Sequence, residues 1–576
     1  MNTFRVKKVT GTYSELLETY GLANFLKKIF DSLGERDSEI MIADRNTFFE
    51  VTVNTDITDE MIERVHYFPP FKYIKVKADT DVSAYPDCYD YPQQKKWKKE
   101  RNEELQRVYK EFQEKEKKEE RERQIKEIES RYDVDMAYDV YSQIRTPNNF
   151  PSFDKLFGNF HHNREMFPLL VKEILIYYSA NTCDSKGFEK QLKGKFFAKN
   201  ITATQLYNPS QGQGLNKLKA DGLNRKNFDS SWVAETMKIS GALSDMVCQL
   251  VKVGDSYDLK VAVPEYKKIR WGNKRALMQA FKKYLKGNTP IKIDILDILL
   301  LTEKLVEHTA IEGKRCNVRN SVTGLHTVYQ KDLGQNKAVV NIGFLQVPDF
   351  IEIGTEDEKA DWCEILKEQR QIIGSIDELG NTIQGLMWYR DFISGSDLNS
   401  FFRFSFWYGS YLSNQLSNRK RARAFTIESL NKFYMSMDTK LREIVENKGF
   451  IAVAKAIRQS TVNLQYTPKE HRKYEVRYGV AQTLQVKSKT SEDLAEYIGE
   501  YIAAYNAETA RQKEKNGQTL RANVREDELT EFYALLDRFS SKLVGAMLAS
   551  YGFALSAKKQ EGMEGEDSSI EESEEE

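Results

Sequence analysis

Positive charges and tyrosines alternate in one short stretch, Ile457 to Gly479, which reads IRQSTVNLQYTPKEHRKYEVRYG. Arginine binds phosphate through paired hydrogen bonds and tyrosine stacks on unpaired bases, so this alternation favours binding of single-stranded nucleic acid. A solvated junction between two helices explains the same composition almost as well. The cations that we expect to hold a DNA strand are Arg458, Lys469, Arg472, Lys473 and Arg477, interleaved with Tyr466, Tyr474 and Tyr478.

A second polar stretch, Tyr207 to Ser231, contains three glycines and almost nothing apolar to bury. Asparagine and glutamine can read adenine edges, and lysine or arginine can bind guanine or phosphate, so this loop has the chemistry to contact a duplex. A surface loop without a particular role is an equally good interpretation of these residues alone. The residues that we expect to contact duplex DNA are Gln211, Gln213, Asn216, Lys217, Lys219, Asn224, Arg225 and Lys226.

Two further basic stretches have ordinary structural explanations. One, YKKIRWGNKRALMQAFKKYLKG, starts at Tyr266, and its charge suits a solvated helix face. The other, NRKRARAF, starts at Asn418, where cations near a helix C-terminus favour the helix dipole.

Enzymatic signatures are missing from the sequence. The six histidines form no HExxH motif and no Cys/His ligand spacing, and the chain has neither a GxSxG elbow nor a Walker loop. His161 and His162 are adjacent and point apart on a helix, so we expect loop or core histidines. We therefore predict no catalytic residue, no metal and no cofactor, although scattered carboxylates could still form an acidic metal site.

The elements that must position these residues change in character along the chain. Residues 1–93 alternate helical and extended patterns, and residues 94–149 read as one long charged helix that projects into solvent. Residues 150–395 mix helices with strands such as SYDLKVAVPEY, and residues 396–556 follow helical spacing throughout, which predicts a bundle of about five helices. The predicted fold class is α+β, a mixed α/β body followed by an all-helical bundle.

Charge is balanced only in total, with 86 basic and 86 acidic residues among 576. The last seventeen residues hold nine acids and no base, which leaves 86 minus 77, or nine excess positive charges, on the rest. We expect residues 557–576 to be a disordered solubilising tail, with an intramolecular DNA mimic as the alternative. The five cysteines are scattered, and neither an apolar span nor a signal region is present, so we expect a cytoplasmic protein without membrane partners.

Several phrases resemble the large subunit of type I CRISPR interference complexes (Cascade). They are NPSQGQGLNKLKADGLNRKNFDSSWVAETMKISG, SYDLKVAVPEY, AIRQSTVNLQYTPK, YEVRYGVAQTLQ, YNAETARQ and LVGAMLASYGFAL. The resemblance implies an N-terminal body that contacts the 5′ end of the guide crRNA and recognises the protospacer-adjacent motif (PAM) in double-stranded target DNA. It also implies a C-terminal bundle, similar to the complex's small subunit, that lies along the displaced and target strands.

The resemblance further implies a nonenzymatic role. Such a subunit binds the other Cascade backbone subunits, stabilises the R-loop and helps recruit a helicase-nuclease in antiviral defence. By this resemblance, motif reading falls to Gln211, Gln213, Asn216, Lys217, Asn224 and Arg225, and strand holding falls to the five cations of the first stretch. The alternatives are a nuclease effector with an undetected acidic metal site and a scaffold that does not bind nucleic acid.

Overall fold

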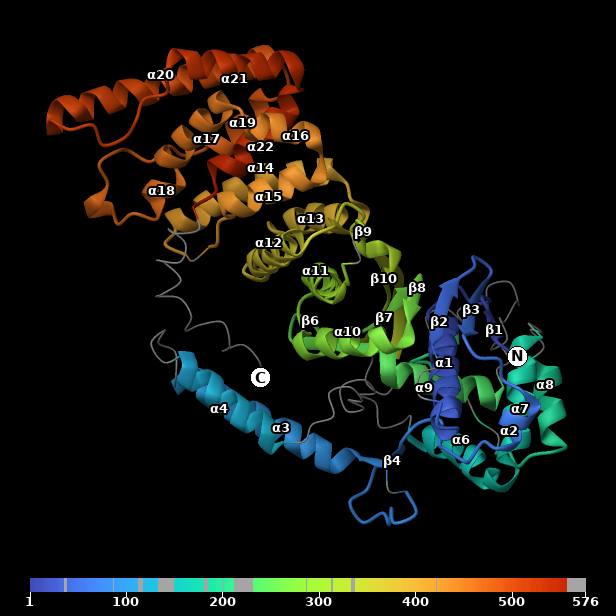
Figure 1. Cartoon of the computed structure of the whole chain (residues 1–576). Helices are drawn as coiled ribbons and strands as arrows, with labels where there is room; N and C mark the ends of the chain where they lie inside the picture. Colours follow the sequence, from blue (N-terminus) through green and yellow to red (C-terminus); the bar gives the residue numbers. More distant parts are fainter. Residues whose placement is uncertain are drawn as a thin grey trace, which may run out of the picture. The chain divides into compact units, whose positions relative to one another are not determined.

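The computed structural model divides into two compact units. Among the described residues, the first contains 1–290 and 319–347, and the second contains 291–318 and 348–556. The fold is α+β, as the sequence predicted (Figure 1). The residues that the structure describes are 1–35, 39–85, 87–111, 118–132, 150–180, 185–199, 201, 203–211, 231–285, 287–311, 314–332, 337–420 and 422–556.

Two antiparallel four-stranded sheets belong to the first unit. One has the order β1 (Thr3–Lys7), β3 (Phe48–Val53), β2 (Ile40–Asp44), β8 (Lys268–Arg270). The other has the order β11 (Lys337–Gln346), β10 (Val322–Asp332), β7 (Ser256–Tyr266), β6 (Val247–Val253). Successive residues of β3 alternate between half-buried and buried, and the buried ones, Phe49, Val51 and Val53, are all apolar, as expected for a strand with one face on a core. The strand predicted from SYDLKVAVPEY is confirmed as β7.

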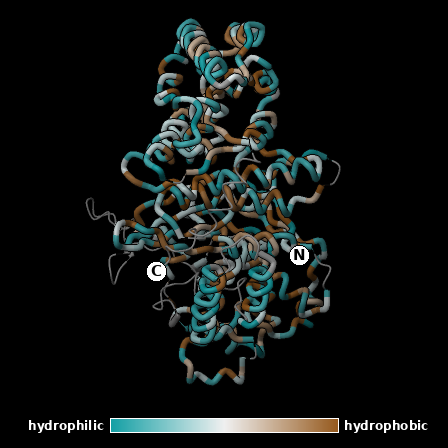
Figure 2. The backbone as a smooth tube through the Cα atoms, turned by 90° about the vertical axis from the view of Figure 1, so that its left-hand side faces the viewer, coloured by the Kyte–Doolittle hydropathy of each residue, from teal (hydrophilic) through white to brown (hydrophobic). Residues whose placement is uncertain are grey.

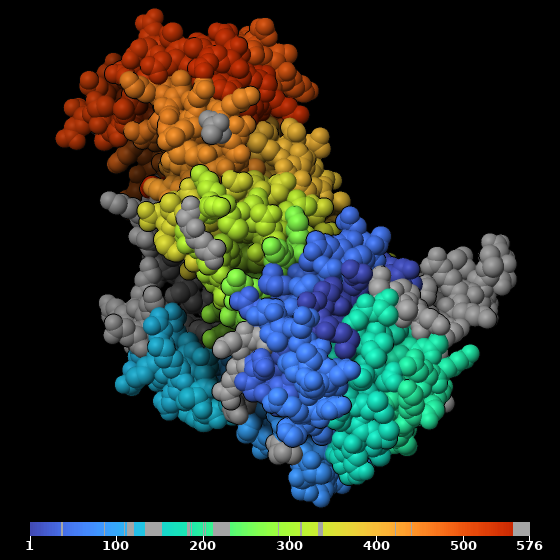
Figure 3. Space-filling model, turned by 45° about the vertical axis from the view of Figure 1, so that its right-hand side comes forward, coloured from blue at the N-terminus to red at the C-terminus, as the bar shows by residue number. Residues whose placement is uncertain are grey.

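Helices cover these sheets, and a short parallel pair joins β4 (Tyr73–Lys75) to β5 (Cys88–Asp90). Figure 3 shows the N-terminal segment, in blue, packed directly against the teal segment of α6 to α8. The helices of this unit outside the charged region are α1 (Ser14–Ser32), α2 (Asp59–Glu63), α6 (Phe150–His162), α7 (Phe167–Ser179), α8 (Ser185–Lys193), α9 (Trp232–Asp245) and α10 (Trp271–Tyr284).

The close crossing of α1 and α9 depends on two glycines. A β-carbon on Gly21 would lie 1.8 Å from the Met237 carbonyl oxygen, and one on Gly241 would lie 2.0 Å from the Leu17 carbonyl oxygen. Only glycine allows two helix backbones to approach this closely. The crossing holds α9 firmly at its place after the glycine-rich loop.

The charged region forms two helices, so the prediction of one long helix is wrong. Helix α3 (Tyr91–Glu111) packs beside α4 (Lys118–Arg131), and Arg131 and Glu104 form an ion pair of 2.8 Å between them. The apolar stripe of α3 explains the difference, because Val108 is buried in the hairpin rather than left on a solvated helix.

Helices make up almost all of the second unit, with one short strand pair, β9 (Cys316–Asn317) and β12 (Glu352–Ile353). Its helices are α11 (Pro290–His308), α12 (Glu356–Gly374), α13 (Ile383–Gly395), α14 (Leu398–Ser417), α15 (Ile427–Met437), α16 (Thr439–Val445), α17 (Lys448–Ser460), α18 (Val462–Gln465), α19 (Val480–Lys487), α20 (Ser491–Asn516), α21 (Glu526–Arg538) and α22 (Ser541–Gly552). Figure 2 colours α20 and α21, at the top of the view, in mixed hydrophilic and hydrophobic residues, as expected for helices with one buried face.

This helical unit starts earlier and is more divided than the sequence indicated. Helices α12 and α13 belong to it, so the predicted start at residue 396 is too late. The described residues between 398 and 552 form nine helices rather than about five. Side-chain caps explain the extra helices: Asp438, Asn447 and Ser540 each accept a backbone N–H and begin a new helix. None of the helices in the described ranges is both long enough and apolar enough to cross a bilayer.

Candidate nucleic-acid interface

The tyrosine-rich basic stretch connects α17 to α19 and is mostly not helical. Helix α18 ends at Gln465, a single 3-10 turn follows at Lys469–His471, and α19 begins only at Val480, after Gly479 with φ of +73°. Tyr474 therefore lies in the non-helical connection before α19. Backbone groups of this segment bond elsewhere instead: Arg477 N donates to Ser460 O at 2.8 Å, which holds the chain extended.

Three of the five predicted strand-binding cations bond to the protein itself. Arg458 Nη1 donates to Tyr551 O at 2.7 Å, and burial lowers the pKa of Arg458 to about 10, so it is still charged at neutral pH. Arg472 donates from Nε to Thr467 O and from Nη2 to Gln465 O. Arg477 Nη1 donates to Tyr501 O at 3.0 Å. These arginines shape the junction, whereas Lys469 and Lys473 are exposed.

The three tyrosines of the stretch also differ in availability. Tyr466 is half-buried and donates from its hydroxyl to Ala422 O at 2.7 Å. The ring of Tyr474 is covered by the guanidinium of Arg521, whose central carbon lies 3.7 Å from the ring centroid. Tyr478 is 61% exposed. Of the three, Tyr478 is therefore the one best placed to stack on a base.

A buried arginine, Arg521, was not predicted from the sequence and stabilises the tyrosine-rich basic stretch. Arg521 lies between the rings of Tyr474 and Tyr505 and forms a 2.7 Å ion pair with Glu508. Its Nε also donates to Thr509 Oγ1 at 2.7 Å. No local signal marks Arg521, because it follows a Gly517 turn among polar residues and its partners are Tyr474 and residues of α20.

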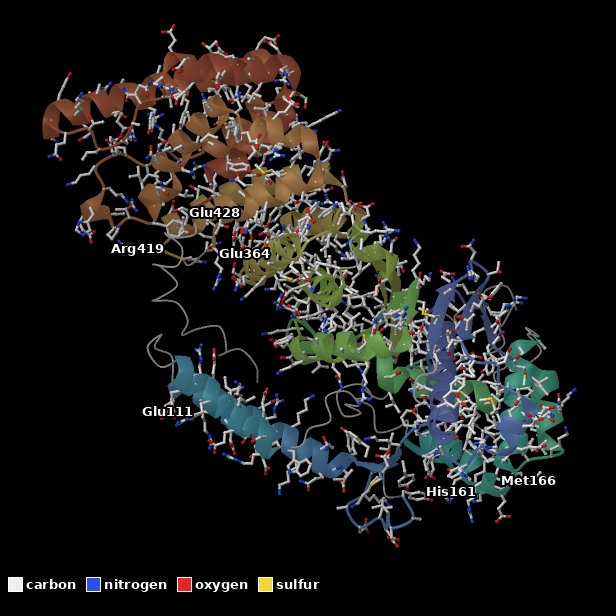
Figure 4. The ribbon with its side chains drawn as sticks, viewed as in Figure 1. Glu111, His161, Met166, Glu364, Arg419 and Glu428 are labelled. Atoms are coloured by element: carbon white, nitrogen blue, oxygen red, sulfur yellow. The ribbon has the colours of Figure 1, made fainter. Side chains whose placement is uncertain are left out.

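The tyrosine-rich basic stretch and the basic stretch NRKRARAF adjoin in the structure. Tyr466 reaches the Ala422 carbonyl, and Gln465 Nε2 donates to Ser413 O at 2.8 Å. These bonds place the connection between α14 and α15 beside the junction. Arg419, labelled in Figure 4, lies in that connection, and Arg419 and Lys420 are both exposed. We call Arg419, Lys420, Lys469 and Lys473 the cationic face.

Glu368 of α12 anchors the connection next to the cationic face. Its carboxylate accepts hydrogen bonds from Thr426 N at 3.0 Å, Thr426 Oγ1 at 2.6 Å and Ser429 Oγ at 3.1 Å. Burial raises the pKa of Glu368 to about 6, although these hydrogen bonds act to lower it. The carboxylate thus accepts hydrogen bonds from the N-terminal residues of α15, where Thr426 is the N-cap.

This raised pKa predicts a pH-dependent stability of the second unit. The folded state binds the proton more tightly than the unfolded state, so stability falls as pH rises from about 4.5 to about 6. The expected loss from Glu368 is about 2 kcal/mol. Urea unfolding of the wild type and Glu368→Gln should show a difference between their free energies that changes by this amount across the window. A difference independent of pH would contradict the prediction.

Most of the glycine-rich loop lies outside the described residues. Gln211 ends a 3-10 turn, and Gln213, Asn216, Lys217, Lys219, Asn224, Arg225 and Lys226 fall beyond it. Their contact with duplex DNA remains a prediction.

The two ends of the loop are described, and a buried network joins them. Asn208, at the start of the loop, donates to Glu235 Oε2, just after its end, at 2.9 Å. Lys238 Nζ donates to Asn208 Oδ1 at 2.9 Å and to Glu235 Oε1 at 3.0 Å. Ser14 Oγ donates to Tyr207 O at 2.8 Å and links the network to α1. The roots of the loop are therefore fixed to the α1–α9 core.

The adjacent histidines lie at the end of α6. His161 packs against the rings of Tyr85 and Phe157, and His162 Nδ1 lies 2.6 Å from the Gly158 carbonyl oxygen. Within the described ranges, His, Cys, Asp and Glu form no group of three or more that could hold a metal ion. Comparison of the sequence with protein-family models and with curated proteins finds no match to either.

Proposed function

We propose that this chain is the nonenzymatic large subunit of a CRISPR RNA-guided surveillance complex that acts in the cytoplasm. In this role it recognises the protospacer-adjacent motif, stabilises the R-loop and helps recruit a helicase-nuclease. Its partners would be the guide crRNA, the double-stranded target DNA and the other subunits of the complex. Sequence choice would come from guide pairing, while the protein supplies motif reading and charge along the backbone.

The observation that carries the proposal is the cationic face. Two basic stretches about fifty residues apart are joined by the Tyr466–Ala422 hydrogen bond on one helical unit, and they carry exposed Lys469 and Lys473 and exposed Arg419 and Lys420. Tyr478 adds an exposed ring to the same junction. Exposed cations and a free aromatic ring are the features that hold single strands without sequence preference. In this proposal the glycine-rich loop, whose roots are fixed to the α1–α9 core, would make the contact with duplex DNA.

Removing the four charges of the cationic face should weaken binding of single-stranded DNA for every sequence alike. One quadruple variant carries Arg419→Gln, Lys420→Gln, Lys469→Gln and Lys473→Gln together. We expect it to bind single-stranded DNA about tenfold more weakly at low salt. The slope of the logarithm of its binding constant against the logarithm of the salt concentration should be smaller by about 3. Filter binding across a salt series measures both quantities. The matched control changes four other exposed lysines of the second unit to glutamine: Lys440, Lys448, Lys455 and Lys489.

Equal losses in the two quadruple variants would contradict strand holding by the cationic face. Changes at Asn216 or Arg225 should instead alter the preference among motif variants in duplex DNA, with little effect on single strands. The nonenzymatic part has its own test: cleavage of DNA by the purified chain with Mg²⁺ or Mn²⁺, abolished by a carboxylate substitution, would favour the nuclease alternative.

A further inference from the structure

The described chain ends beside the cationic face. Leu555 N donates to Phe425 O at 2.9 Å, and Ile427 N donates to Leu555 O at 2.9 Å, so the backbone at Leu555 pairs with the connection that carries Arg419 and Lys420. Leu555 itself is buried, 1% exposed. The backbone at Leu555 is therefore fixed at Phe425–Ile427, five residues along the chain from the exposed Lys420.

The chain beyond that point carries the opposite charge. Residues 561–576 contain nine acids and no base. The cationic face contributes four exposed positive charges, and three exposed acids belong to the same two segments: Glu470 and Glu475 in the tyrosine-rich stretch and Glu428 at the start of α15. The excess of acids in the tail and of bases on the face makes the two segments electrostatically complementary.

The tail is also long enough to reach the face. Glu561 is six residues beyond Leu555 and Glu576 is twenty-one, which correspond to at most about 20 Å and about 70 Å of extended chain. A tethered segment of this length has an effective concentration near its target in the millimolar range. Ion pairs between exposed charges of the tail and the face can therefore form within one chain, although each pair alone contributes little.

We propose that residues 561–576 bind the cationic face of their own chain and compete there with nucleic acid. The contact between tail and face stands on the geometry and charge given above, and the competition rests on the proposed function. Because exposed charge pairs are screened by salt, a longer polyanion displaces the tail when it can neutralise more cations at once. Short or weakly bound strands then do not displace the tail and are excluded from the cationic face.

The first experiment changes all nine acids of residues 561–576 to their amides in the full-length chain. We expect its dissociation constant for a short mixed-sequence single strand to fall about tenfold at 50 mM salt, with the difference vanishing near 0.5 M. A shuffled tail that keeps the nine acids serves as the control and should behave like the parent. In the background of the four-glutamine cationic-face variant, neutralising the tail should change the affinity little. An unchanged affinity in the parent background, or an equal gain in both backgrounds, would overturn the proposal.

The second experiment needs no nucleic acid. Carbodiimide joins carboxylates to amines in direct contact, so peptide mapping should find tail carboxylates linked to Lys420, Lys469 and Lys473. Links spread evenly over the exposed lysines of the chain would overturn the contact. Links that form only between chains, in a mixture of isotope-labelled and unlabelled protein, would also overturn it.

The two experiments separate this proposal from the proposed function. Specific links without any binding of DNA would uphold the contact and contradict the function. Binding of DNA that is the same with and without the acids, together with no specific links, would uphold the function and contradict the proposal.

Discussion

Replacing Gly449 by alanine should unfold the second unit under conditions where the wild type is folded. A β-carbon at this position of α17 would lie 2.1 Å from the Glu528 carbonyl oxygen and 2.4 Å from the Phe532 nitrogen, both in the backbone of α21. No side-chain rotation can relieve a clash between two backbones, so the helices must move apart. We expect a loss of about 3 kcal/mol or more, at the upper end of the range for overpacked cores.

The matched control is Gly374→Ala at the end of α12. No atom lies within 4 Å of the β-carbon that this substitution would add. Alanine there should leave the free energy of unfolding unchanged or raise it by up to about 1 kcal/mol, because it restricts the unfolded chain. Urea unfolding followed by circular dichroism compares the two variants. Similar midpoints for both would show that α17 and α21 do not cross as closely as the structure has them.

Replacing Arg521 by alanine should have an effect of similar size and should also loosen the junction. Arg521 is almost completely buried, and its loss removes a 2.7 Å ion pair with Glu508 and the stacking partner of Tyr474 and Tyr505. Breaking a buried ion pair by removing one partner costs about 3–5 kcal/mol. Arg477, at 3.7 Å from Glu508, compensates only in part.

The readout of this prediction includes a local one. Glu475 N donates to Glu508 Oε1 at 3.2 Å, so its amide hydrogen should exchange faster in Arg521→Ala than in the wild type. Arg521→Lys keeps the charge but loses the stacked plane and should recover only part of the stability. Arg511→Ala, an exposed arginine of α20, is the control and should cost less than about 1 kcal/mol. Equal costs for Arg511→Ala and Arg521→Ala would contradict the supporting role.

Local patterns were enough for much of the fold. The segment SYDLKVAVPEY predicted β7, and the helical spacing of residues 396–556 predicted a helical region that includes α20, whose N-cap is Thr490. The same patterns did not predict that the short apolar stripe of α3 packs against a second helix. In the sequence, Val108 is one apolar residue on an otherwise charged helix. Only its burial in the structure shows that α3 packs beside α4.

The sequence by itself determined which residues carry charge, where the chain turns and that an acidic segment ends it. Only the tertiary structure decided which cations remain free. Arg458 and Arg477 read like Lys469 and Lys473, but their guanidinium groups bond to the carbonyls of Tyr551 and Tyr501. Those partners are separated from them by many residues, and their approach depends on how helices pack, which no local spacing encodes. The same packing brings Ala422 to Tyr466 and so joins two basic stretches into one face.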